Sequence, residues 1–159
     1  MTPEFDATEF ARELSRSIVK ELQKRHEQLR EYELSALVVD CHPWHGILDL
    51  AVLTDQDEAG KWEIGEWELY PLTDSEDAED SWSETQVWRE RMRTYWQARV
   101  AESPDAAEAA TDLILRACAA ALSSDEVQAE ISRLRLASDF ELFVGNPDDA
   151  EDRNFCSSG

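Results

Sequence analysis

The chain has 159 residues, of which 36 are acidic and 15 basic, so its formal net charge is −21, and 42% of its residues are hydrophobic. This length and apolar content predict one domain with a buried core, and they exclude an acidic disordered chain and a disulfide-rich mini-protein. So negative a charge is repelled by nucleic acid and by anionic lipid, and we therefore expect no direct nucleic-acid binding and no membrane association.

The first predicted element is a long amphipathic helix over residues 3–31. Thr2 is a good N-cap, and Pro3 suits the first position of a helix. Large apolar residues recur every four positions along this segment: Phe10, Leu14, Ile18 and Leu22. The remaining positions carry charges of both signs, so we expect one stripe of the helix to pack on the core.

Three strands are predicted next. Residues 34–40 and 47–54 are rich in β-branched and aliphatic side chains, and the short connection between them contains Pro43 and Gly46, which predicts an antiparallel hairpin. The third predicted strand covers residues 62–70. Its internal glycine is typical of a bulge, and the proline that follows it ends the strand.

The second half of the chain predicts three helices and a final strand, over residues 84–101, 104–123, 125–136 and 140–145. Ser103 and Ser124 are the expected N-caps of the second and third of these helices. Residues 146–159 are expected to form a flexible acidic tail.

This order of elements predicts a single α+β domain over residues 1–159. We expect a mostly antiparallel sheet of about four strands, with the long N-terminal helix and two to three helices of the second half packed on it. The predicted core consists of Phe10, Leu14, Ile18, Leu22, Leu37, Val39, Leu48, Leu50, Val52, Trp67, Leu69, Trp88, Trp96, Leu113, Leu122 and Phe143.

One cluster of potential metal ligands lies in the predicted hairpin turn. Cys41, His42 and His45 follow Asp40 within a few residues, and such side chains can bind zinc or iron, or can activate the thiol. A closed zinc site commonly uses two separated ligand pairs, and the sequence offers no second Cys/His pair. The favoured interpretation is a turn with exposed histidines and a half-buried cysteine, and we expect no cofactor.

The middle of the chain carries the largest acidic excess. Residues 32–83 contain fourteen acids and a single base, Lys61, and all six tryptophans lie between Trp44 and Trp96. Tryptophans ringed by charge are typical of interface hot spots. This pattern predicts a partner-binding surface made of Trp62, Trp67, Asp74, Glu76, Asp77, Glu79, Asp80 and Trp82. The alternative is a solvated loop whose charge serves solubility.

Two smaller charge clusters have simpler interpretations. Glu66 and Glu68 are expected on one solvated face of the third predicted strand, although these two and Glu63 could also supply paired carboxylates for acid–base catalysis. Four arginines form a basic island on the helix predicted over 84–101: Arg89, Arg91, Arg93 and Arg99. They can pair with the acidic segment over residues 74–84, which holds six acids and no base, or with another subunit. Three widely spaced cysteines and an acidic N-terminus predict reduced thiols and a cytoplasmic location.

Three segments give the chain a resemblance to a known family: the strand pair that ends at Thr54, the sequence around Gly65, Glu66 and Trp67, and the final strand that runs into aspartates. In pattern and order, over most of its length, the chain resembles a bacterial family of small cytosolic proteins that is catalogued only as a domain of unknown function and grouped with toxin-immunity candidates. The resemblance implies an immunity role and brings no catalytic residue.

These observations predict a non-enzymatic binding protein that presents an acidic, tryptophan-bearing surface to a basic protein such as a toxin nuclease. A first alternative is a small metal-dependent enzyme or metal-binding protein that uses Cys41, His42 and His45. A second alternative is a structural or regulatory subunit whose acidity serves solubility.

Overall fold

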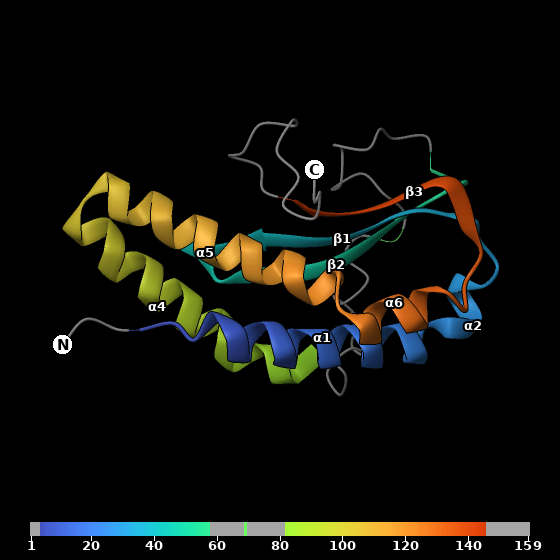
Figure 1. Cartoon of the computed structure of the whole chain (residues 1–159), viewed down its shortest axis with the longest axis horizontal. Helices are drawn as coiled ribbons and strands as arrows, with labels where there is room; N and C mark the ends of the chain where they lie inside the picture. Colours follow the sequence, from blue (N-terminus) through green and yellow to red (C-terminus); the bar gives the residue numbers. More distant parts are fainter. Residues whose placement is uncertain (1–3, 58–68, 70–81, 146–159) are drawn as a thin grey trace.

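The computed structural model describes residues 4–57, 69 and 82–145 (Figure 1). Several predictions fall outside these residues: the third strand apart from Leu69, the acidic segment up to Ser81, and the tail over residues 146–159. Five α-helices and three strands occur in the described residues, which makes the fold α+β as predicted.

The first helix, α1 (Ala7–Lys24), begins later than the predicted start at Thr2. Its N-cap is Asp6, whose Oδ1 accepts a hydrogen bond of 3.0 Å from the backbone N–H of Glu9. Phe5 and Phe10 flank this cap with their ring centroids 5.2 Å apart. An apolar pair around an acidic cap fixes the direction in which the chain enters the helix. The predicted stripe of Phe10, Leu14, Ile18 and Leu22 is buried.

The predicted helix over residues 3–31 is also divided near its end. Arg25 leaves the helical conformation, with φ −96° and ψ 6°, and a short helix, α2 (His26–Leu29), follows it. The Arg25 Nε donates to Glu21 Oε1 at 2.9 Å, and Glu21 is fully buried. A buried carboxylate is costly unless it is paired, so this ion pair holds the end of α1 against the core.

The sheet has the strand order β2-β1-β3 in the described residues. The strands β1 (Leu34–His42) and β2 (Ile47–Thr54) form the predicted antiparallel hairpin, with Val39 opposite Leu50. Leu69 makes an isolated antiparallel bridge to Val52 at the outer edge of β2.

The prediction of a mostly antiparallel sheet is corrected by the last strand, β3 (Leu136–Gly145). It pairs with β1 in parallel, with Val38 opposite Phe143. The chain returns from the helices of the second half to the end of the sheet where β1 starts, and there Leu34 N–H donates to the Arg135 carbonyl at 2.8 Å. A long crossover through helices allows parallel pairing, whereas a tight turn does not.

Three helices of the second half complete the fold: α4 (Gln86–Glu102), α5 (Pro104–Leu122) and α6 (Asp125–Ile131). The expected caps are confirmed, since Ser103 Oγ accepts from Ala106 N–H at 3.0 Å and Ser124 Oγ accepts from Val127 N–H at 3.3 Å. A 3-10 turn, η4 (Ser83–Thr85), precedes α4.

The helices and the sheet form two layers, with α1, α4, α5 and α6 on one side of the sheet (Figure 1). The main core lies between these layers, and the sheet contributes Leu37, Val39 and Cys41 from β1 together with Leu48, Leu50 and Val52 from β2. A smaller buried cluster lies on the opposite face of the sheet and consists of Ala36, Val38, Ala51 and Phe143. No described helix has the length and apolar character that crossing a bilayer requires.

Most of the predicted core is buried, with three exceptions. Leu113 is 37% exposed, because α5 turns Ala110, Ile114 and Ala117 toward the interior instead. Trp96 is only partly buried, and its indole N–H donates to Thr111 Oγ1 on α5 at 2.9 Å. Trp67 lies outside the described residues.

Candidate functional site

The hairpin turn does not bring its three potential metal ligands together. Cys41 belongs to the buried core beneath the helices, His42 is half-buried beside Asp40, and His45 is exposed. Alternate residues of a strand point to opposite faces of its sheet, so Cys41 and His42 diverge. Within the described ranges, no group of three or more Cys, His, Asp or Glu side chains could hold a metal ion.

The Cys41 thiol lies in an environment that keeps it protonated. A hydrogen bond with Cys118 and complete burial raise its pKa well above the ordinary value of 9.0, and the charges of Asp40 and Asp49 raise it further. Its Sγ also lies 4.0 Å from the Met92 Sδ. A nucleophilic cysteine needs a lowered pKa and access to solvent, whereas Cys41 has the opposite properties.

His42 is held by an acidic and an aromatic neighbour. His42 Nε2 lies 3.1 Å from Asp40 Oδ1, and its ring stacks on Trp44 with centroids 5.8 Å apart. Trp44 in turn contacts Trp96 of α4, with centroids 6.1 Å apart. Aromatic packing therefore anchors the turn to α4, and the His42 ring is part of this packing.

Trp82 is the one residue of the predicted partner surface that the structure describes. Its side chain is buried, with 4% of its surface exposed, and its indole N–H donates to the Leu48 carbonyl at 2.9 Å. In this position it joins η4 to β2 and cannot act as an exposed anchor. The other predicted partner-binding residues, Trp62, Trp67, Asp74, Glu76, Asp77, Glu79 and Asp80, lie outside the described residues.

The described residues contain a second acidic and aromatic site, where α4 crosses the start of α1. We call it the α1 groove; it has a volume of about 360 Å³ and is lined by Glu4, Phe5, Asp6, Trp88 and Arg91. Phe5 is the centre of its aromatic floor: its ring lies 5.7 Å from the rings of both Trp88 and Tyr95, measured between centroids. These rings are largely buried, so the groove offers a shallow apolar floor beneath a charged rim.

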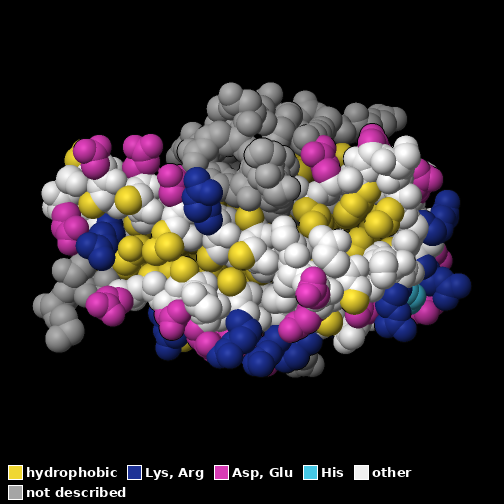
Figure 2. Space-filling view, in the orientation of Figure 1, with side chains coloured by type: hydrophobic (Ala, Val, Ile, Leu, Met, Phe, Trp, Pro, Cys, Tyr) yellow, Lys and Arg dark blue, Asp and Glu magenta, His cyan; other side chains and the backbone are white. Residues whose placement is uncertain are grey.

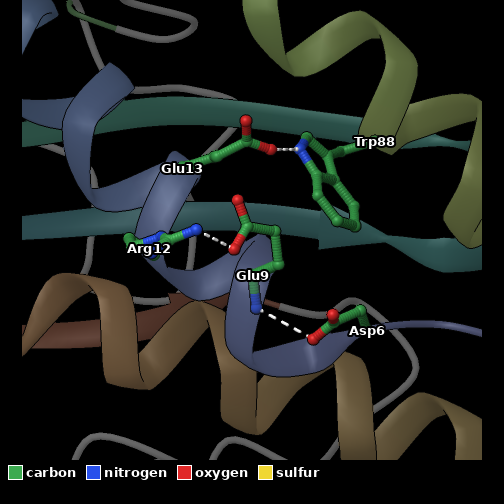
Figure 3. Close-up of polar contacts among 5 residues, drawn as sticks. All are labelled: Asp6, Glu9, Arg12, Glu13 and Trp88. Carbon is green, nitrogen blue, oxygen red and sulfur yellow. Dashed lines mark hydrogen bonds and ion pairs between the residues drawn. The ribbon is translucent and has the colours of Figure 1, made fainter.

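Charged side chains hold the groove in place and give it its polarity. Figure 3 shows Glu13 on α1 receiving the indole N–H of Trp88, next to the Asp6 cap and the ion pair between Glu9 and Arg12. The hydrogen bond to Glu9 raises the pKa of the Arg12 guanidinium. The same carboxylates place negative charge at the N-terminal end of α1, where the helix dipole stabilises it.

Arg91 is the one cation among the described residues that line the groove, and its Cζ lies 4.8 Å from the centroid of the Trp88 ring. This cation–π contact shows that the aromatic floor can hold a guanidinium. In this structure the guanidinium of Arg91 itself lies over the Trp88 ring.

The sequence analysis did not predict the α1 groove, although the sequence pattern that marks the start of α1 is present. Phe5 and Phe10 flank the pair Asp6 and Glu9, and an acid at the N-cap with a second acid three residues later marks a helix start. The contribution of Trp88 has no local signal, because it requires α4 to cross α1.

Charge is unevenly distributed over the described surface. Figure 2 shows acidic side chains gathered over the end of α5 that meets α4, and basic side chains along α1. Acidic side chains also lie between the basic ones along the lower edge of this face, so the two signs of charge are interleaved there.

Comparisons with protein-family models, with curated proteins and with solved structures found no match.

Proposed function

We propose that this chain is a non-enzymatic acidic binding protein, of the immunity or inhibitor kind, that binds a basic protein such as a toxin nuclease. The observation that carries the proposal is the charge of residues 32–83, where fourteen acids accompany one base. A nuclease attracts polyanions to its substrate groove, so an acidic surface of this density is complementary to it.

The α1 groove supports the proposal from the described residues. It combines two carboxylates, Glu4 and Asp6, with an aromatic floor that already contacts one guanidinium, that of Arg91. Interfaces commonly use such aromatic and charged combinations to hold an arginine or lysine of the partner. Trp82 does not support it, because its side chain serves the core.

The metal-binding alternative gains no such support, since the side chains of Cys41 and His42 lie on opposite faces of β1. The solubility alternative makes a different prediction about specificity: a chain that is acidic only for solubility binds basic proteins indiscriminately and weakly.

The experiment first captures the basic partner protein from a lysate of the source cells. It then compares two charge-neutralised variants by the rate at which they associate with that partner. The test variant is Asp77→Asn, Glu79→Gln and Asp80→Asn. Its matched control neutralises three exposed acids outside residues 32–83: Glu27→Gln, Glu31→Gln and Glu108→Gln. We expect the test variant to associate about tenfold more slowly at low salt and to depend less on ionic strength, because steering charges act on the on-rate.

The control separates local complementarity from total charge. Both variants lose three negative charges, so an equal loss of on-rate in the two would show that only net charge matters. An unchanged on-rate in the test variant would remove the acidic segment from the binding mechanism. A third variant, Glu4→Gln, tests the α1 groove and is expected to speed dissociation.

A further inference from the structure

A second pocket, on the other side of α4, has the opposite charge. It lies where the hairpin turn contacts α4, has a volume of about 200 Å³, and is lined by His45, Gly46, Gln86, Arg89, Glu90 and Arg93. Arg89 and Arg93 are one helical turn apart and therefore lie on the same face of α4. The chain as a whole is strongly acidic, with a net charge of −21, so two arginines in one pocket make a locally basic site.

Among the described residues, the guanidinium groups of Arg89 and Arg93 lack the carboxylate partners that Arg12, Arg25 and Arg99 have. Neither Arg89 nor Arg93 makes an ion pair with a described carboxylate. The Arg89 Nε is buried and has no hydrogen-bond partner. A buried charged donor without an acceptor is destabilising, and like charges at this helical spacing repel.

The turn is fitted closely to this part of the helix. Gly46 has φ +65°, and a Cβ at this position would lie 2.9 Å from the Arg89 carbonyl oxygen and 3.5 Å from the Arg93 Cβ. The turn therefore approaches the backbone of α4 as closely as a residue without a side chain allows. This contact fixes His45 beside the two arginines, so the pocket is formed before any ligand arrives.

We propose that this pocket binds a small oxyanion of the phosphate type. Two guanidinium groups provide planar, charge-assisted hydrogen bonds that match a phosphate group, and the His45 ring supplies a third polar group at the same opening. A doubly charged anion neutralises both arginines, whereas a single carboxylate neutralises one. The volume of about 200 Å³ leaves room for a phosphate together with a small attached group.

Glu90 is the acidic residue among the described lining of the pocket. Its exposed carboxylate adds a negative charge that opposes the binding of an anion. Glu90→Gln is therefore expected to strengthen phosphate binding, by about threefold, since it removes a nearby like charge.

The experiment is a titration with inorganic phosphate, followed through the backbone amide signals of His45 and Gly46 in NMR spectra at constant ionic strength. We expect saturable shifts in the millimolar range for the unmodified chain. Arg93→Gln, whose side chain is exposed, is expected to weaken binding about tenfold, because it removes a charge-assisted contact. Arg89→Gln gives a second variant with the same expected direction.

Arg99→Gln is the matched control, because it removes the same charge from the same helix outside the pocket. Linear shifts that do not saturate would overturn the proposal, and so would an equal weakening by Arg99→Gln and Arg93→Gln. A parallel titration with acetate distinguishes the ligand classes: saturation by acetate with equal or higher affinity would refute the assignment to phosphate.

Discussion

Replacing Gly46 by alanine tests the contact between the hairpin turn and α4. Gly46 is the only described residue with a positive φ, at +65°, and any side chain there also meets the backbone oxygen of Arg89 at 2.9 Å. A left-handed conformation costs a non-glycine residue about 1–2 kcal/mol, and overpacking against a fixed backbone costs about 1–3 kcal/mol more. Alanine also lowers the conformational entropy of the unfolded chain, which stabilises the folded protein by about 0.4–1 kcal/mol. Subtracting this gain leaves an expected net destabilisation of about 1–5 kcal/mol.

The assay is urea unfolding, monitored by tryptophan fluorescence. The comparison is valid if the free energy of unfolding falls with urea concentration at the same slope in both proteins. Gly46→Asn separates the two contributions, because asparagine tolerates positive φ but still has a Cβ. We expect it to be about 1–2 kcal/mol less destabilised than the alanine variant, because the cost of the left-handed backbone is largely removed while the steric cost remains.

An alanine variant within about 0.5 kcal/mol of the unmodified chain would refute the close approach of the turn to α4. An asparagine variant as unstable as the alanine variant would refute the contribution from the left-handed backbone. The same two variants also displace the lining of the phosphate pocket, so both should bind phosphate more weakly.

Three further predictions follow from buried contacts. Trp82→Phe removes the donor to the Leu48 carbonyl and should lower the free energy of unfolding by about 1–3 kcal/mol in urea; a loss below about 0.5 kcal/mol would contradict the buried hydrogen bond. Because the folded pKa of Cys41 is raised, stability should fall as pH rises above 9.0, by up to about 1.4 kcal/mol per pH unit, and Cys41→Ala should remove that slope. Ser103→Ala removes the cap of α5 and should cost about 1 kcal/mol in thermal unfolding, whereas no change in Tm would show that the cap contributes nothing.

The parts of the fold that could be predicted are those set by local pattern. The four-residue spacing of Phe10, Leu14, Ile18 and Leu22 determines the buried face of α1, and Ser103 and Ser124 mark helix starts because their hydroxyls cap backbone N–H groups. The hairpin is local too, since Gly46 supplies the positive φ that its turn requires.

The parts that could not be predicted depend on packing between distant segments. Nothing near β3 indicates that it pairs in parallel with β1, because this depends on where α6 delivers the chain. Leu113 looks like core by its periodicity, yet α5 presents small residues such as Ala110 and Ala117 to α1 and the sheet, which leaves it exposed.

The candidate sites follow the same division. Cys41 and His42 are neighbours in the sequence, but alternation along the strand places their side chains on opposite faces of the sheet. Closeness in the sequence therefore wrongly suggests a shared metal site. The phosphate pocket joins a turn to a helix more than forty residues later, and only the folded chain places His45 beside Arg89 and Arg93.

The proposal of a basic protein partner is tested most directly by affinity capture from a lysate of the source cells at low and at moderate salt, with mass spectrometry of the retained proteins. We expect one basic protein in stoichiometric amount, retained at moderate salt and lost when Asp77, Glu79 and Asp80 are neutralised. Retention of many basic proteins, all released by about 0.2 M salt, would show that the charge acts without specificity and would contradict the proposed function.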